Sequence, residues 1–180
     1  MAEIHKSDSL TQRNVEDEIF KKLEKFPKIQ EKLGSKELKK DEFPIGSVKF
    51  QVDFYNEECG IFGEIYASNF PLKSGHSRKI RTDILKMITI EKLKKVDVEK
   101  YLVLTVHKKD FKNGELFKDY SLIEHGDEIG KLNMLGKKTW FNETLRLFNI
   151  KVLYYVLSEK DFAILNVARS NQNEGMKNLL

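Results

Sequence analysis

The chain has 180 residues, of which 40% are hydrophobic and 33% charged, and its formal net charge is +4. A chain of this length can bury a core of its own, so we predict one domain over residues 1–180. The mild positive charge permits contact with a polyanion without requiring it. The single cysteine, Cys59, excludes an internal disulfide and a cysteine-only metal cluster and favours a reducing compartment.

We expect no secretory signal at the start of the sequence. The segment MAEIHKSDSLTQR has no apolar centre of the kind found in secretory signals. No apolar run in the sequence approaches the ~20 residues that span a bilayer. We therefore expect a cytoplasmic protein without membrane contact, whose polar residues 1–10 are loose.

A first helix is predicted to begin near Asn14, because Asn is a good N-cap and three acidic residues follow it. Glu18 lies on the flank of the apolar stripe of this helix and could reach along the core edge toward a sheet. An acid that serves only the helix dipole is the simpler explanation. The apolar stripe consists of Val15, Ile19, Leu23 and Phe26.

Residues 48–68 read as two strands joined by a polar turn, after a charged connector at 35–42. Phe50, Val52 and Phe54 alternate with polar residues, as in a half-buried strand. Residues 56–60 supply turn chemistry, and residues 61–67 continue as a second strand. The second strand contains a glycine, Gly63, which allows close backbone approach just before Glu64.

Each of these two strands carries one carboxylate. If the strands pair antiparallel, Asp53 and Glu64 lie at similar heights, and a divalent cation would offset their repulsion. Hard cations such as Mg²⁺ prefer oxygen ligands. The alternative is that both acids are solvated on an exposed sheet face, and the spacing alone does not exclude it.

A long helix is predicted from Arg78 to Lys95, with Ser77 as its cap. Its first turn carries Arg78, Lys79 and Arg81, where acidic residues are normally favoured. This placement fits a nearby anion, either a phosphate or the carboxylates of the strand pair, and a solvated cationic face is the simpler alternative. The cations that we expect to bind phosphate are Lys73, Arg78, Arg81 and Lys86.

The remaining elements complete an alternating pattern. Residues 101–106 are nearly all apolar and predict a central strand. A further strand is predicted at 150–157. A helix is expected at 138–148, and Ser158 can cap a last helix whose tail frays after Arg169. Residues 107–138 are not assigned. The order of elements predicts an α/β sandwich with a mixed sheet.

With these residues placed, the arrangement resembles the PD-(D/E)XK nuclease superfamily, which has the restriction-endonuclease-like fold. Asp53 matches the aspartate of its first strand, Glu64 the glutamate of its Glu-x-Lys motif, and Glu18 the glutamate of the preceding helix. The resemblance covers about residues 14–157 and leaves 158–180 as a terminal helix and tail. It implies a three-layer sandwich in which helices flank a central mixed sheet.

The resemblance also implies a catalytic centre and one departure from the family pattern. Asp53, Glu64 and the backbone carbonyl of Ile65 would hold Mg²⁺, for which Mn²⁺ could substitute, and a lysine would stabilise the reacting phosphate. Tyr66 stands where the lysine of the motif belongs. Some members recruit this lysine from the next helix. The replacement candidates, in order of preference, are Lys79, Lys86 and Lys49.

Two functions remain open from the sequence. The first is an Mg²⁺-dependent nuclease that hydrolyses phosphodiester bonds of DNA or RNA. The second is a catalytically inactive module that binds nucleic acid or protein on the same scaffold, which the missing lysine favours. The expected partner is nucleic acid, and a homodimer is left open. Neither a GxxxxGK[ST] nor a GxGxxG motif is present, and the four histidines lack metal-ligand spacing.

Overall fold

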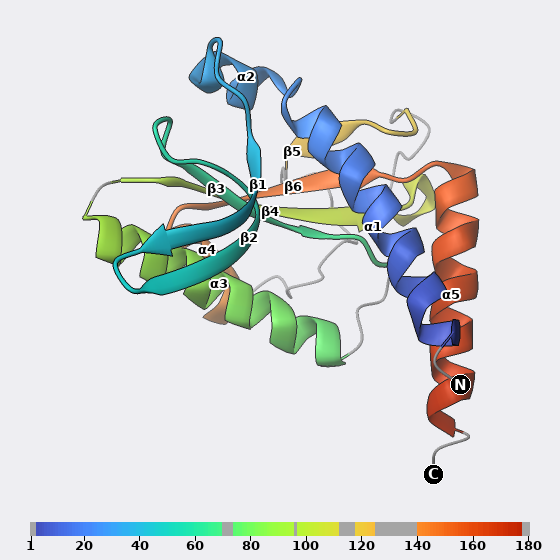
Figure 1. Cartoon of the computed structure of the whole chain (residues 1–180). Helices are drawn as coiled ribbons and strands as arrows, with labels where there is room; N and C mark the ends of the chain where they lie inside the picture. Colours follow the sequence, from blue (N-terminus) through green and yellow to red (C-terminus); the bar gives the residue numbers. More distant parts are fainter. Residues whose placement is uncertain (1–2, 70–73, 96, 112–117, 125–139, 178–180) are drawn as a thin grey trace.

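A six-stranded mixed sheet lies between two layers of helices in the described part of the chain (Figure 1). The computed structural model describes residues 3–69, 74–95, 97–111, 118–124 and 140–177. The strands lie in the order β1-β2-β3-β4-β6-β5. This arrangement confirms the predicted α/β class and is compatible with a three-layer sandwich.

The elements have the following bounds. The helices are α1 (Glu3–Leu23), α2 (Pro27–Leu33), α3 (Ser74–Lys94), α4 (Trp140–Leu147) and α5 (Glu159–Lys177), with a short 3₁₀ turn, η1 (Lys108–Asp110). The strands are β1 (Lys39–Ile45), β2 (Val48–Asn56), β3 (Ile61–Tyr66), β4 (Glu99–Val106), β5 (Leu122–Glu124) and β6 (Ile150–Val156).

The sheet combines an antiparallel half with a parallel centre. Strands β1, β2 and β3 form an antiparallel meander, as predicted for the two strands that carry the acids. Strands β3, β4 and β6 run parallel, and β5 adds an antiparallel edge to β6. The central position of β4 agrees with its apolar sequence, since a strand covered on both faces has no polar side.

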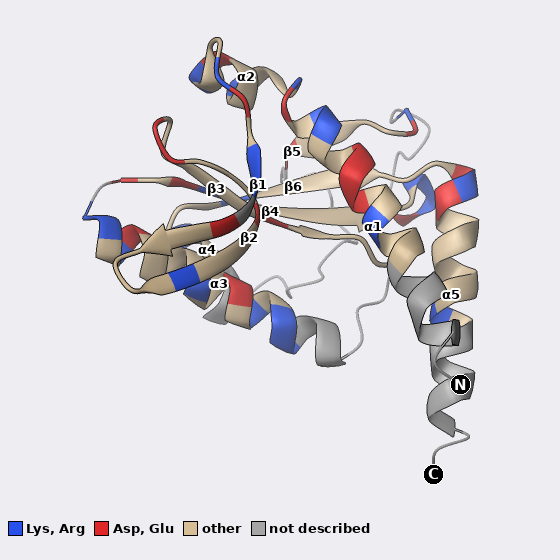
Figure 2. Ribbon diagram, in the orientation of Figure 1, with Lys and Arg blue, Asp and Glu red and all other residues tan. Residues whose placement is uncertain are grey.

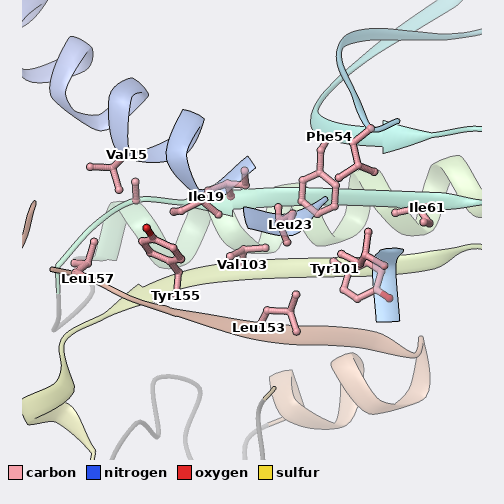
Figure 3. Close-up of a cluster of buried hydrophobic side chains, with 14 of the residues drawn as sticks. Val15, Ile19, Leu23, Phe54, Ile61, Tyr101, Val103, Leu153, Tyr155 and Leu157 are labelled. Carbon is pink, nitrogen blue, oxygen red and sulfur yellow. The ribbon is translucent and has the colours of Figure 1, made fainter. Parts of the chain in front are cut away.

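One face of the sheet is covered by α1, α2 and α5 (Figure 3). Val15, Ile19 and Leu23 of α1 pack onto side chains of β2, β3, β4 and β6 in one cluster. The predicted stripe of the first helix is therefore confirmed at these three positions. The sheet side of this cluster includes Phe54, Ile61, Ile65, Tyr101, Val103, Leu153 and Tyr155.

The opposite face is covered by α3 and α4. Ile80, Ile84 and Met87 of α3 pack with Tyr66 and with alternate residues of β4 and β6. Along β3, therefore, odd-numbered side chains point toward α1 and even-numbered ones toward α3. This alternation directs Glu64 toward α3.

A bulge in β2 interrupts the alternation that the sequence suggests. Between the pairs Lys39–Tyr55 and Asp41–Val52, β1 advances by two residues and β2 by three, so Asp53 and Phe54 share one position on β1. As a result Val52 packs on the α3 face, whereas Phe54 packs on the α1 face. The prediction that Val52 and Phe54 share a face is therefore wrong, because a bulge reverses the side-chain order beyond it.

Gly63 is required by the ring of Phe54, its partner across the β2–β3 ladder. A Cβ atom on Gly63 would lie 2.1 Å from Cζ of Phe54, far inside van der Waals contact. The close approach predicted at this glycine is thus made by an aromatic ring. Because Gly63 has no side chain, the Phe54 ring can lie directly against β3, one residue before Glu64.

Hydrogen bonds join the end of β3 to α5. The side-chain amide of Asn69 donates to the Phe162 carbonyl oxygen (2.9 Å) and to Asn166 Oδ1 (2.8 Å). Arg169 donates to the carbonyl oxygen of Asn69 (2.8 Å). In addition, α5 packs along α1, so it connects the strand that carries Glu64 with the first helix.

Both terminal helices are longer than predicted. α1 begins at Glu3 rather than near Asn14, and most of residues 1–10 are helical instead of loose. α5 continues to Lys177, so the frayed tail predicted after Arg169 is wrong. The two helices lie side by side. Ser158 caps α5 as predicted, since its Oγ accepts from the Asp161 N–H (3.0 Å).

Two further boundaries differ from the sequence analysis. The charged connector at 35–42 overlaps β1, which is paired along β2 although its sequence is polar. α3 begins at Ser74, so Ser77 is not its cap and Arg78 is not in its first turn. Within the unassigned region 107–138, the structure describes η1 and β5. Lys73 and residues 125–139 lie outside the described residues.

We expect Gly63→Ala to lower the free energy of unfolding by about 1–3 kcal/mol, because the added methyl group overlaps the Phe54 ring. Urea denaturation monitored by circular dichroism measures this loss. The double variant Gly63→Ala/Phe54→Leu is the control. It should lose less than the sum of the two single variants, since the smaller side chain makes room. Strict additivity would contradict the proposed contact.

Candidate metal and phosphate site

The two acids of the strand pair lie close enough where β2 leaves β3 for the charge of Asp53 to raise the pKa of Glu64. The ladder pairs Phe54 with Gly63, and one step further along this register Asp53 stands opposite Glu64. At that step the Ile65 N–H donates to Asp53 Oδ2 (2.7 Å). The proximity predicted for the two acids is therefore present, and the bulge turns the Asp53 carboxylate toward β3. The role of the Ile65 carbonyl as a metal ligand stays a prediction.

Lys86 of α3 reaches Glu64 from the adjacent helix layer. Its Nζ atom lies 2.6 Å from Glu64 Oε1 and 3.2 Å from Asp83 Oδ1. It also donates to the backbone carbonyl oxygen of Gln51 (2.6 Å). Glu64 and Asp83 are only 3% and 6% exposed. A single ammonium group is thus enclosed by three oxygen atoms from β2, β3 and α3.

The helix acid that approaches the site is Glu16, not Glu18. The partly buried Glu16 is close enough to Asp53 and to Lys79 for both charges to affect its pKa, whereas Glu18 is exposed. At ~100° per residue, Glu16 lies nearer than Glu18 to the centre of the buried stripe formed by Val15, Ile19 and Leu23. That angle was the sequence signal that could have identified it.

Tyr66 takes the motif position of the missing lysine, and its ring is covered by Lys79. The Lys79 Nζ atom lies 4.8 Å from the ring centroid, within the range of a cation–π contact. Burial, then the charges of Asp83, Glu64 and other nearby acids, raise the pKa of the Tyr66 hydroxyl, which is therefore neutral. Lys79 is exposed along α3 and makes its described contact with this ring rather than with Glu64.

Burial and mutual repulsion favour proton binding by two of the acids. Burial, and then the charge of Asp53, raise the pKa of Glu64 to about 9, although Lys86 opposes the shift. Burial and Asp53 likewise raise the pKa of Glu16 to about 7. For Lys86, burial favours the neutral amine, but the ion pairs with Glu64 and Asp83 outweigh it and raise the pKa. The lysine therefore stays charged at neutral pH.

Several other predicted site residues lie elsewhere. Arg78 and Arg81 are exposed on the second turn of α3, so the unfavourable first-turn placement that suggested an anion does not occur. Lys49 pairs with Glu42 at 2.7 Å on the β1–β2 hairpin and does not reach Glu64. Figure 2 shows that acidic and basic segments alternate along the described part of α3.

Asp83 is a member of the site that the sequence analysis did not single out. It lies one turn before Lys86 on α3 and points inward, and its Oδ2 atom has no hydrogen-bond partner. An acid buried in this way is costly unless a cation compensates it. A sequence signal existed, because Asp83 falls on the inward-facing side of the helix one residue before the buried Ile84.

The donor set suits a hard divalent cation with an incomplete protein shell. Among the described residues there is no group of three or more His, Cys, Asp or Glu side chains that could hold a metal ion. Mg²⁺, however, commonly takes one or two carboxylates and fills its other positions with water and substrate phosphate. Asp53 and Glu64 supply such a pair, and their repulsion is the feature that a cation would relieve.

His107 is buried rather than exposed on a loop, but it contributes to a cap and not to this site. Its Nδ1 accepts from the Lys109 N–H (3.3 Å), and its Nε2 lies 3.1 Å from Glu159 Oε2. The ring packs against Phe162, with 4.1 Å between the ring centroids. These contacts anchor the start of α5, which explains its burial without a metal.

Comparison with family models, with curated proteins and with solved structures finds no match to this chain. In the part of the chain that the structure describes, no helix combines the length and the apolar character needed to cross a bilayer.

The raised pKa of Glu64 makes the stability of the metal-free protein depend on pH. Above the ordinary pKa of 4.5, the folded state holds a proton that the unfolded state has lost, so stability falls as pH rises toward the folded pKa of about 9. Glu64→Gln cannot titrate. In chelator, we therefore expect the Tm difference between this variant and the wild type to grow from about pH 5 to about pH 9.

Thermal unfolding monitored by circular dichroism at several pH values makes this measurement. Glu42→Gln is the matched control, because Glu42 is an exposed acid of the neighbouring hairpin. Its Tm difference from the wild type should stay nearly constant over the same range. A constant difference for Glu64→Gln as well would show that Glu64 ionises normally in the folded protein.

Proposed function

We propose that this chain is a metal-dependent nuclease built like the PD-(D/E)XK superfamily, and that it hydrolyses phosphodiester bonds of nucleic acid. The observation that carries the proposal is the meeting of Asp53, Glu64 and the Lys86 ammonium at the point where β2 leaves β3. Two carboxylates for a metal and one lysine for a phosphate are the groups that this reaction requires.

The proposed roles follow from the position of each group. Asp53 and Glu64 would hold Mg²⁺, which when bound polarises the phosphate and acidifies an attacking water. The Asp53 carboxylate is oriented by the Ile65 N–H and so needs little reorganisation. In the reaction a water oxygen bonds to phosphorus, the ester P–O bond breaks, and the departing oxygen takes up a proton. Glu16, whose pKa is raised to about 7, can hold or release a proton near neutral pH.

The geometry favours Lys86 over Lys79 as the replacement for the missing motif lysine. Lys86 contacts Glu64 directly, whereas Lys79 lies over the Tyr66 ring. Lys86 approaches from α3, but its ammonium lies beside the same glutamate that a Glu-x-Lys lysine would accompany. Its raised pKa keeps it charged, as stabilisation of a phosphate requires.

Nucleic acid is the substrate class that the surroundings support. Arg78, Lys79 and Arg81 are exposed along the first half of α3, on the helix that delivers Lys86. Exposed cations next to a carboxylate site allow a polyanion to be held while the metal neutralises one phosphate. The net charge of +4 is consistent with such a partner.

The metal is tested by thermal stability. We expect saturating Mg²⁺ or Mn²⁺, at ~100 times the dissociation constant, to stabilise the wild type by about 2.7 kcal/mol. For a chain of this size that corresponds to about 5–10 °C in Tm. Asp53→Asn should abolish this response and can stabilise the metal-free protein by relieving repulsion. The control Glu42→Gln should respond like the wild type. Equal responses of all three proteins would exclude the site.

The lysine is tested by cleavage of single- and double-stranded DNA and RNA oligonucleotides in Mg²⁺ or Mn²⁺. Lys86→Met should lower the cleavage rate by ~10²–10³, as expected for the loss of one charge-stabilising donor. The matched control is Lys79→Met, which removes a lysine from the same helix and should cost less than about tenfold. A larger loss for Lys79→Met than for Lys86→Met would reverse the assignment.

The same oligonucleotides distinguish the enzyme from the inactive alternative. A wild type that binds them in a salt-dependent manner but never cleaves them would be a binding module on the nuclease scaffold. In that case, cleavage by Tyr66→Lys would show that the missing motif lysine is the cause. A wild type that neither binds nor cleaves would exclude the proposed substrate class.

A further inference from the structure

The geometry points to a second cation position in this site, which the Lys86 ammonium fills, and we propose that the wild type therefore takes one divalent ion rather than two. The first ion, between Asp53 and Glu64, rests on the proposed function. The second position rests on contacts of Lys86 itself. It is lined by Glu64 Oε1 at 2.6 Å, Asp83 Oδ1 at 3.2 Å and the Gln51 carbonyl oxygen at 2.6 Å.

The ligands of this position are those of a metal site. All three are oxygen atoms, two from carboxylates and one from a backbone carbonyl, as hard divalent cations prefer. When both carboxylates are ionised, as metal ligands are, their two negative charges exceed the single positive charge of the ammonium group. The second carboxylate oxygen of Asp83, Oδ2, is buried without a hydrogen-bond partner. One ammonium ion therefore leaves this position incompletely compensated.

A tethered ammonium nevertheless excludes a second ion from this position. Lys86 is anchored on α3 and is only 22% exposed at its side chain, so its ammonium lies close to the two acids without loss of translational freedom. A free ion must displace it and leave a charged amine in a partly buried place. Removal of the lysine side chain would expose two buried carboxylates and open the position to a metal ion.

The test counts Mn²⁺ ions bound per chain, by titration with detection of free Mn²⁺ by electron paramagnetic resonance. Lys86→Ala should bind one ion more than the wild type. Lys79→Ala is the matched control, because it removes a lysine from the same helix that does not contact Glu64 or Asp83 in the described structure. It should bind the same number of ions as the wild type.

A second variant assigns the gained ion to its ligands. Asp83→Asn in the Lys86→Ala background should lose the additional ion, since it removes one of the two charged ligands. Two outcomes with these variants would overturn the inference: no gain in Lys86→Ala, or a gain that persists after Asp83→Asn. If Lys86→Ala folds only with metal, it is purified in Mn²⁺, and the ions bound per chain are counted by elemental analysis after gel filtration. The expected numbers of bound ions are the same as in the titration.

The number of ions that the wild type binds tests the proposed function, separately from the inference about Lys86. A wild type that binds no Mn²⁺ contradicts the site between Asp53 and Glu64 and with it the proposed nuclease. The inference about Lys86 is judged instead by the difference between Lys86→Ala and the wild type. A gain of one ion over a wild type that binds one ion or none supports it. No gain, or a wild type that already binds two ions, overturns it.

Discussion

Opposite Lys40 of β1, two residues of β2 occupy the space of one, and the rest of the site depends on this bulge. Without it, Asp53 and Phe54 would follow the strict alternation of the strand, and Phe54 would lie on the α3 face with Val52. The bulge instead places Phe54 against Gly63 in the core below α1 and turns the Asp53 carboxylate to the Ile65 N–H. Bulges commonly re-aim a side chain in this way at functional sites.

The centre of the site contains more acid than base, and the fold retains this imbalance. Glu64 and Asp83 are almost fully buried, yet they share one lysine, while Asp53 and Glu16 are two further acids nearby. Burial of carboxylates in excess of cations costs stability, so a protein selected only for stability would replace them with apolar residues. The proposed divalent cation would supply the positive charge that this arrangement lacks.

Local sequence was sufficient for some of this organisation and insufficient for the rest. The hairpin that brings Asp53 and Glu64 together follows from alternation and turn residues, and the central strand β4 follows from its apolar run. The structure brings Lys86 rather than Lys79 to Glu64, because the position of α3 along the sheet is set by the packing of Ile80, Ile84 and Met87 and not by the helix start. Glu16 could have been identified from its angle to the buried stripe of α1, but the part of the sheet that this angle faces is set by the packing of α1 against the core.

The hydrogen bonds of Asn69 have a consequence for the dimensions of the site. Asn69 follows the strand that carries Glu64, and it fastens that strand to Phe162, Asn166 and Arg169 of α5. In turn, α5 packs along α1, which carries Glu16. The position of Glu16 relative to Glu64 therefore depends on α5, although none of the acids described at the centre comes from α5. The placement of the end of β3 relative to α1 therefore depends on residues after 157, more than ninety positions beyond Glu64.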